Sequence, residues 1–258
     1  MSAVAPSLYR HPVPLDPARH RARRIAPLVD FSIARALHAV YVTATEFPQA
    51  GLEFPLVFVD TGRHDGAGRP LMSPLALLGL VQGENLHVED GRWQARYIPA
   101  YIRRYPFSTA AKPGAGPADV LVDDAWEGFS ESTGESLFEA DDRPAPALRR
   151  AIEFLERFER EAERTRAFCE RVVALGLLKG MKADATLPDG RALSIDGFHA
   201  IDEDKLRALP DATVVELHRS GLLALMQVHL LSLANIRHLV SRKAARLQAD
   251  AAAGASRH

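Results

Sequence analysis

Arginine and tyrosine are interleaved along residues 96–107, and this segment has the side chains best suited to recognising a ligand. Its members of these two types are Arg96, Tyr97, Tyr101, Arg103, Arg104 and Tyr105. A guanidinium carries a planar fork of donors, and a tyrosine ring beside it adds a flat amphipathic surface, a combination that suits carboxylates, peptide grooves or stacked bases. Glu84, Asn85 and Trp93 precede the segment and complete the candidate binding site. The alternative, which stays open, is a half-buried sheet edge where arginines stack on aromatic rings for packing.

The two adjacent arginines are not expected to be equivalent. If Pro99 starts a helical turn, Tyr101, Arg104 and Tyr105 share one side of it, and Arg103 points elsewhere. A guanidinium between two tyrosine rings keeps donors free for a carboxylate or a carbonyl. We therefore expect Arg104 to belong to the functional surface.

No metal or cofactor site is expected. The chain has ten histidines, but no His-x-x-x-His or Glu-x-x-His pair falls on an expected helix, and His218, His229 and His238 do not share one helical face. His229 stands in an apolar stretch, which favours a hydrogen-bonded core histidine.

Nucleophilic and acid–base catalysis have no clear candidates either. There is no Gly-x-Ser-x-Gly elbow, and Cys169 falls on the apolar stripe of an expected helix, so a buried structural thiol is favoured. The carboxylate pairs are Asp123-Asp124, Asp141-Asp142 and Asp202 with Asp204. They stand in turn-like contexts and are interpreted as solvated or capping groups.

Strands dominate the first half of the chain. Strands are expected within 31–45, 54–59 and 75–81, with a glycine-rich loop at 61–70. The clearest hairpin joins 85–89 to 92–97 through Asp90-Gly91, because Asp-Gly supplies the positive φ angles of a type I′ turn.

Helices dominate the second half. Apolar residues recur at helical spacing from Leu148 to Leu175, with Glu153–Arg157 and Glu156–Arg160 as outer i,i+4 pairs. Pro188-Asp189-Gly190 turns a second hairpin, Asp202 caps a short helix, and a final helix spans 222–246. The pattern predicts an α+β fold, with a largely antiparallel sheet in the N-terminal half and helices from the C-terminal half packed on it.

The expected organisation is an extended Pro/Arg-rich arm at 1–27, a single domain at 28–246 and a frayed tail at 247–258. A net charge of −1 disfavours nucleic acid, so the arm is read as lying on the domain, with a phosphate or acidic-partner contact as the alternative. A lone cysteine and the lack of a signal segment favour the cytoplasm. The longest apolar stretch, 222–233, is too short for the roughly 20 residues of a membrane span.

Several strings of the sequence resemble one known family. They are Leu77-Leu78-Gly79-Leu80, Gly83-Glu84-Asn85-Leu86, Gly91-x-Trp93 and 97–107, supported by Glu46-Phe47, 54–58, Leu137-Phe138, Gly197-Phe198 with Ile201-Asp202, and 232–235. Together they resemble the SapC-like family over about 10–243. The family is bacterial, its name comes from an antimicrobial-peptide transport operon, and its members are often labelled permeases. The resemblance implies no catalytic residues, and it implies flavin-dependent halogenase-like or cupin-like enzymes as partners.

The expected function is that of a soluble accessory or binding protein in a bacterial peptide- or protein-modification or uptake system. It would hold a polypeptide or a partner enzyme through the Arg/Tyr-rich segment. The alternative is an enzyme of unrecognised type with a polar pocket around Glu84, Arg96 and Arg104. An enclosed pocket would favour the enzyme, and an open groove would favour the binding protein.

Overall fold

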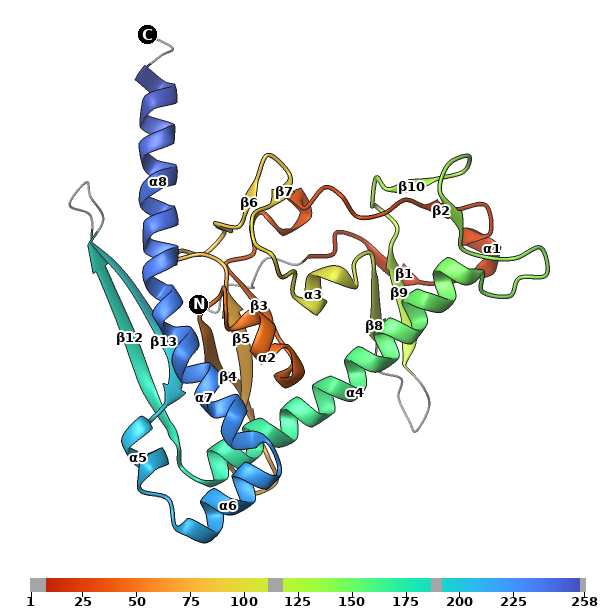
Figure 1. Ribbon diagram of the computed structural model, residues 1–258. Coiled ribbons are helices and arrows are strands. Elements are labelled where there is room, and N and C mark those ends of the chain that lie inside the picture. The colour runs from red at the N-terminus through yellow and green to blue at the C-terminus, as the bar shows by residue number, and fades with distance from the viewer. Residues whose placement is uncertain (1–7, 111–117, 187–191, 256–258) are drawn as a thin grey trace.

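A five-stranded antiparallel sheet forms the centre of the protein, whose computed structural model describes residues 8–110, 118–186 and 192–255. In spatial order its strands are β12 (Leu178–Thr186), β13 (Ala192–Ile201), β4 (Leu56–His64), β5 (Pro70–Leu77) and β3 (Ala39–Tyr41) (Figure 1). Strands lie mainly in the N-terminal half and helices in the C-terminal part, which confirms the α+β prediction. Two strands from the second half of the chain extend the sheet at one edge, and the turn expected at 188–190 lies outside the described residues.

The β4–β5 hairpin is longer than the sequence indicated. Residues 61–70 were expected to be a loop, but β4 continues to His64 and β5 begins at Pro70. The ladder is irregular between Asp60 and His64, where Gly62 has a φ of 71°. A glycine at positive φ lets a strand accommodate such a bulge and continue, so Gly62 lies within the strand and does not mark a loop.

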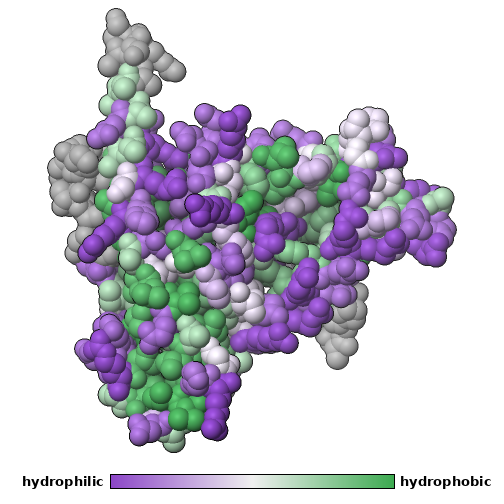
Figure 2. Space-filling model, in the orientation of Figure 1, coloured by the Kyte–Doolittle hydropathy of each residue, from purple (hydrophilic) through white to green (hydrophobic). Residues whose placement is uncertain are grey.

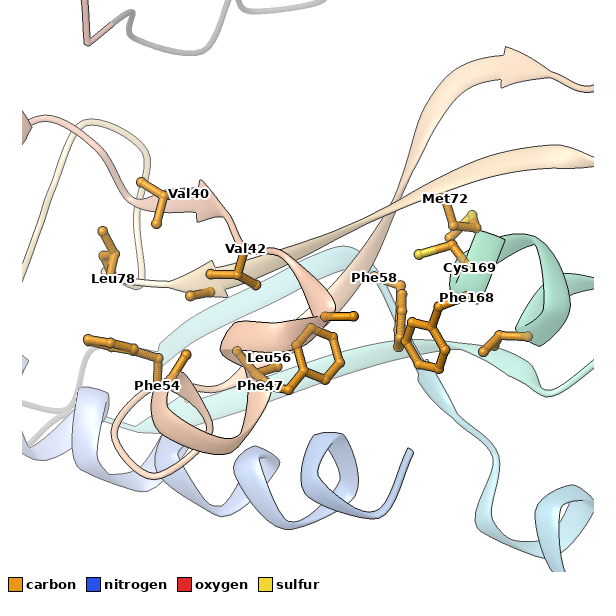
Figure 3. Packing of buried hydrophobic residues seen from close by; sticks show 14 of the residues in the cluster. Val40, Val42, Phe47, Phe54, Leu56, Phe58, Met72, Leu78, Phe168 and Cys169 are labelled. Carbon is orange, nitrogen blue, oxygen red and sulfur yellow. The ribbon is translucent and has the colours of Figure 1, made fainter. Parts of the chain in front are cut away.

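One long helix, α4 (Pro146–Ala174), crosses the molecule and confirms the amphipathic helix predicted here. Its C-terminal half packs on the sheet, where the Phe58 and Phe168 rings lie 6.1 Å apart (Figure 3). Cys169 lies beside them and is buried, and burial raises the pKa of its thiol to about 12. The thiol is therefore protonated at neutral pH, as expected for a structural cysteine.

Helices follow β13 in the C-terminal part of the chain, and α7 among them packs on β4 and β13. They are α5 (Glu203–Arg207), α6 (Asp211–Arg219), α7 (Leu222–Ser232), the 3-10 turn η3 (Leu233–Asn235) and α8 (Ile236–Ala255). Asp202 caps α5 as predicted, accepting from the backbone N–H of Asp204 and Lys205. His229 is buried in α7 and its Nε2 accepts from the N–H of Ile201 at 3.1 Å, which confirms the core histidine.

The final helix differs from the prediction in two ways. It is interrupted at η3, and α8 remains helical to Ala255, beyond the expected end at residue 246. Within the described residues, the segment Leu222–Ala252 is long and apolar enough to cross a membrane by length and composition alone, and 28% of its most apolar window is buried. The sequence-based estimate, which took only the 12 residues 222–233, missed this segment because helical structure does not stop at Leu233.

The N-terminal arm is paired with the domain. Strand β1 (Pro12–Pro14) pairs with β9 (Asp119–Asp123), which also pairs with β8 (Phe107–Ala110), while β2 (Arg24–Ile25) lies between β10 (Phe129–Ser130) and β11 (Glu135–Ser136). In the arm, which also contains α1 (Pro17–His20), Arg19 and Arg23 form ion pairs with Asp124, and Arg21 pairs with Asp142. These charges are neutralised within the chain, which weakens the case for a phosphate contact through the arm.

The predicted Asp90-Gly91 hairpin is present but short. Strands β6 (Val88–Glu89) and β7 (Arg92–Trp93) flank the turn, and its two residues have φ angles of 47° and 74°. The short helical turns before and after the hairpin in the sequence are η1 (Ser32–Ala34), η2 (Ala44–Glu46), α2 (Phe47–Ala50) and α3 (Ala100–Arg103). Pro99 immediately precedes α3, as the prediction assumed.

Candidate functional site

Two glutamates hold the chain that follows the hairpin. Glu53 accepts from the backbone N–H groups of Arg96 at 2.8 Å and Tyr97 at 3.1 Å. Glu46 accepts from the hydroxyl of Tyr97 at 2.8 Å and from the N–H of Ala100 at 2.7 Å. Residues 96–100 are thereby fixed against η2 and α2.

Glu46 is a fully engaged, buried carboxylate. It is 6% exposed, and its second oxygen accepts from the N–H and the hydroxyl of Thr43 at 2.8 and 2.9 Å. Four donors therefore surround one carboxylate. Burial and the neighbouring Glu46 together raise the pKa of Tyr97, so its hydroxyl remains a donor at neutral pH. Glu46 was not among the predicted site residues, although the Thr43-x-x-Glu46 capping box could have indicated it.

A second buried carboxylate holds the other end of the segment. Asp123 is 0% exposed and accepts from the hydroxyl of Tyr105 at 2.9 Å and from the N–H groups of Arg10 and His11 at 2.9 and 2.8 Å. Burial raises the pKa of the Asp123 carboxyl, but the hydrogen bonds outweigh it and hold the pKa below its usual value. The interpretation of Asp123 as a solvated or capping group is wrong for this reason.

Arg104 lies in an aromatic cage, but the cage differs from the predicted one. Its guanidinium carbon lies 4.4 Å from the ring centroid of Tyr101, 4.8 Å from Phe158 and 5.9 Å from Tyr9. Tyr105 turns away, because its ring packs on Tyr9 and its hydroxyl binds Asp123. The second ring beside Arg104 is thus Tyr9, from the N-terminal arm, so Arg104 connects α3, α4 and the arm.

Arg103 is the arginine of this pair that reaches solvent. Its Nε donates to the carbonyl of Ile98 at 2.9 Å, and its guanidinium lies 5.7 Å from the Tyr97 ring and 5.3 Å from the Phe154 ring. Arg157, one turn further along α4, also lies over Phe154, at 5.8 Å. Arg157 does not form the expected ion pair with Glu153 within the described part of the chain, whereas Arg160 lies 3.9 Å from Glu156 as predicted.

Two open hollows flank Tyr97. One, of about 540 Å³, is lined by Gln49, Leu52, Glu53, Arg96 and Tyr97. The other, of about 110 Å³, lies between α3 and α4 and is lined by residues that include Glu46, Arg103, Phe154 and Arg157. We call the exposed groups around them, Leu52, Arg96, Arg103 and Arg157 with the ring of Phe154, the arginine surface.

The remaining predicted residues have structural contacts. Asn85 is completely buried, donating to the carbonyl of Ala34 and accepting from the N–H of His87. The indole N–H of Trp93 donates to the carbonyl of Tyr97 at 2.8 Å. Glu84 pairs with Lys243 at 2.6 Å. Asn85 and Trp93 therefore support the segment from within, and Glu84 connects it to α8.

The residues proposed for the enzyme alternative are not grouped together. Glu84 pairs with α8, Arg96 lines the hollow beside Leu52, and Arg104 is enclosed by aromatic rings. None of the hollows described here is lined by two of these three residues. Among the described residues, no group of three or more His, Cys, Asp or Glu side chains is placed to hold a metal ion.

Comparison with known proteins gives one match. The family model named SapC matches residues 15–239, which is most of the chain. No curated protein and no solved structure matches it.

Proposed function

The chain belongs to the SapC family, a match that brings no reaction or ligand with it, and on the geometry of its surface we propose that it is a binding protein. It would act as a cytoplasmic accessory protein of a bacterial peptide- or protein-modification or uptake system. Its ligand would be a polypeptide segment or a partner enzyme, held at the arginine surface.

The observation that supports this proposal most strongly is that three exposed arginines have no carboxylate partner among the described residues. They are Arg96, Arg103 and Arg157. By contrast, Arg164, which lies on α4 as Arg157 does, pairs with Glu161 at 2.7 Å. Unpaired guanidiniums grouped around an aromatic ring keep their planar forks available for carboxylates or carbonyls of another molecule.

The surroundings of these arginines favour a polypeptide. Leu52 is 75% exposed at the edge of the larger hollow, and the Phe154 ring lies between Arg103 and Arg157. Arginine beside an aromatic ring is a combination that is enriched in protein-binding interfaces. Both hollows are open, which favours a bound chain segment over an enclosed small substrate.

The two adjacent arginines have different surroundings, which supports different roles for them. Arg103 is exposed and contacts Tyr97 and Phe154, whereas Arg104 is enclosed by Tyr101, Phe158 and Tyr9. The proposal therefore assigns the ligand contact to Arg103 and Arg96. It assigns Arg104, which the sequence had favoured for binding, to positioning α3.

The test is affinity capture from native cells with the full chain as bait, read by mass spectrometry. The double variant Arg96→Glu, Arg103→Glu is compared with Arg150→Glu, which changes an exposed arginine on α4 whose ion-pair partner, Glu135, lines neither hollow. We expect polypeptides to be captured by the wild type and by the control and lost from the double variant. The halogenase-like and cupin-like enzymes implied by the resemblance are the first candidates to look for. Equal capture by all three chains would show that the arginine surface is not the binding site.

A further inference from the structure

The outer face of α7 is uncovered and, apart from Gln227, apolar. Leu231, on α7, is 75% exposed, and Val215, on α6, is 45% exposed. Figure 2 shows a hydrophobic area over α6 and α7 that only a few hydrophilic residues interrupt. Leu52, also 75% exposed, follows Gly51, whose carbonyl accepts from the side chain of Asn235 at 2.9 Å, so it lies beside the end of α7. Apolar patches that protein does not cover mark interaction sites.

The opposite face of α7 is fully used inside the protein. Met226, His229 and Ser232 are each 0% exposed, and the Ser232 hydroxyl accepts from the backbone N–H of Leu56 at 3.0 Å. The helix is apolar on both faces, although one buried face is enough to hold it on the sheet. Folding therefore accounts for the inner leucines and leaves Leu231 without a structural role.

The stretch of sequence that contains α7 and most of α8 carries cations and no acidic residue. No acidic residue occurs between Glu216 and Asp250, although the whole chain has a net charge of only −1. The basic residues in this interval are Arg219, Arg237, Arg242, Lys243 and Arg246, with His218, His229 and His238. Arg219 precedes α7 and Arg237 follows it, and both are exposed with exposed histidines beside them. An apolar face with cations at both ends complements a surface that is apolar below an anionic layer.

We infer that the α6–α8 region docks on an anionic phospholipid surface, with Leu231 and its apolar neighbours at the acyl boundary and Arg219 and Arg237 at the headgroups. The helix lies on the membrane and does not cross it. Crossing would remove Met226, His229 and Ser232 from the sheet, and it would leave the N–H groups of Leu56 and Ile201 without their acceptors. Of the residues named for the arginine surface, only Leu52 lies beside this face.

The occupant we assign is a lipid surface because an exposed apolar helix with flanking cations complements anionic lipid. The hollow near α8, of about 630 Å³, is lined by three arginines but also by Glu89, Asp90 and Asp250, so it has no net attraction for an anion. Helix α7 itself carries no acidic residue. A second copy of the chain would bring the same cations together, and like charges disfavour that contact.

The test is sedimentation of the full chain with phosphatidylcholine vesicles, with and without about one-third phosphatidylglycerol, in low salt. We expect binding only to the anionic vesicles and release by high salt, because the cations supply part of the affinity. Leu231→Asp should lower the partition coefficient at least about tenfold, since it places a charge where an apolar side chain is buried. Val29→Asp is the matched control, because Val29 is 76% exposed in another part of the chain and should leave the coefficient unchanged.

Charge-reversal variants separate the electrostatic contribution to vesicle binding from the apolar contribution. Arg219→Glu with Arg237→Glu should abolish the preference for anionic vesicles, while the unfolding midpoint in urea stays unchanged because both side chains are exposed. No sedimentation of the wild type with anionic vesicles would overturn the inference. So would equal losses for Leu231→Asp and Val29→Asp. A wild-type dimer by light scattering that Leu231→Asp converts to a monomer, without vesicle binding, would assign the face to a second copy.

Discussion

Replacing Glu46 by glutamine should destabilise the protein far more than the same change at Glu53, although both carboxylates hold the same stretch of chain. Glu46 receives four hydrogen bonds in a buried site, from Thr43, Tyr97 and Ala100. A glutamine side chain has one oxygen, so its amide group must face two of these donors. Thr43 Oγ1 or the Tyr97 hydroxyl can turn to accept, but a backbone N–H cannot, and one is left unsatisfied.

The magnitude follows from these contacts. A buried, unsatisfied N–H costs about 1–3 kcal/mol, and each bond that changes from a charged to a neutral acceptor loses about 1 kcal/mol. Burying an amide in place of a charge offsets part of this loss. We expect Glu46→Gln to lower the free energy of unfolding by about 3 kcal/mol. Glu53 is only half-buried, so water can replace its bonds, and Glu53→Gln should cost less than about 1 kcal/mol.

Urea unfolding followed by circular dichroism measures both values on the same scale. Equal slopes against denaturant would show that the variants unfold from comparable native states. If the two substitutions differ by less than about 0.5 kcal/mol, the buried four-donor site does not determine how the segment is held, and the reasoning fails.

Three further predictions concern neighbouring groups. Arg104→Ala should lower the free energy of unfolding by about 2 kcal/mol because it empties an aromatic cage. Arg103→Ala should change the free energy of unfolding little and weaken partner binding by about 1–3 kcal/mol. The opposite pattern would return Arg104 to the binding surface. Burial lowers the pKa of His87 to about 3, with Arg242 and Arg246 adding to it, and burial lowers that of His229 to about 4. The unfolded chain binds protons at these two histidines near pH 6.5 and the folded chain does not. The free energy of unfolding should therefore fall by about 2 kcal/mol for each histidine between pH 7 and pH 5. In urea unfolding, His87→Phe should remove about half of the combined fall from the two histidines. Cys169 should not react with a thiol reagent until the protein unfolds, and rapid labelling of the native protein would contradict its burial.

The sequence predicted those parts of the structure that depend on local pattern. Helix α4 follows from apolar residues at helical spacing, and the turn at Asp90-Gly91 follows from the φ angles that these residues tolerate. The capping box from Thr43 to Glu46 is also local and could have been recognised. Each of these features depends either on residues a few positions apart or on a regular spacing of apolar residues.

The contacts that position the candidate site are long-range, and no local pattern indicates them. Asp123 receives donors from residues 112 and 113 positions earlier in the chain, and Glu46 reaches Ala100 across 54 positions. Tyr9, which completes the cage of Arg104, comes from an arm that composition presented only as a proline-rich segment. The sequence therefore indicated which segment carries arginine and tyrosine, but not which of these side chains the fold would use internally.

The two buried carboxylates explain how this segment can combine rigidity with a free surface. Glu46 and Asp123 each accept one tyrosine hydroxyl from the segment, at Tyr97 and at Tyr105, and each also accepts backbone N–H groups. The tyrosines are thus committed to folding, and they hold the segment at both ends. Arg96 and Arg103 project from this fixed backbone without a carboxylate partner among the described residues, so a ligand that binds them need not order the chain first. Substituting the tyrosines should therefore act through stability, and substituting these two arginines should act through affinity.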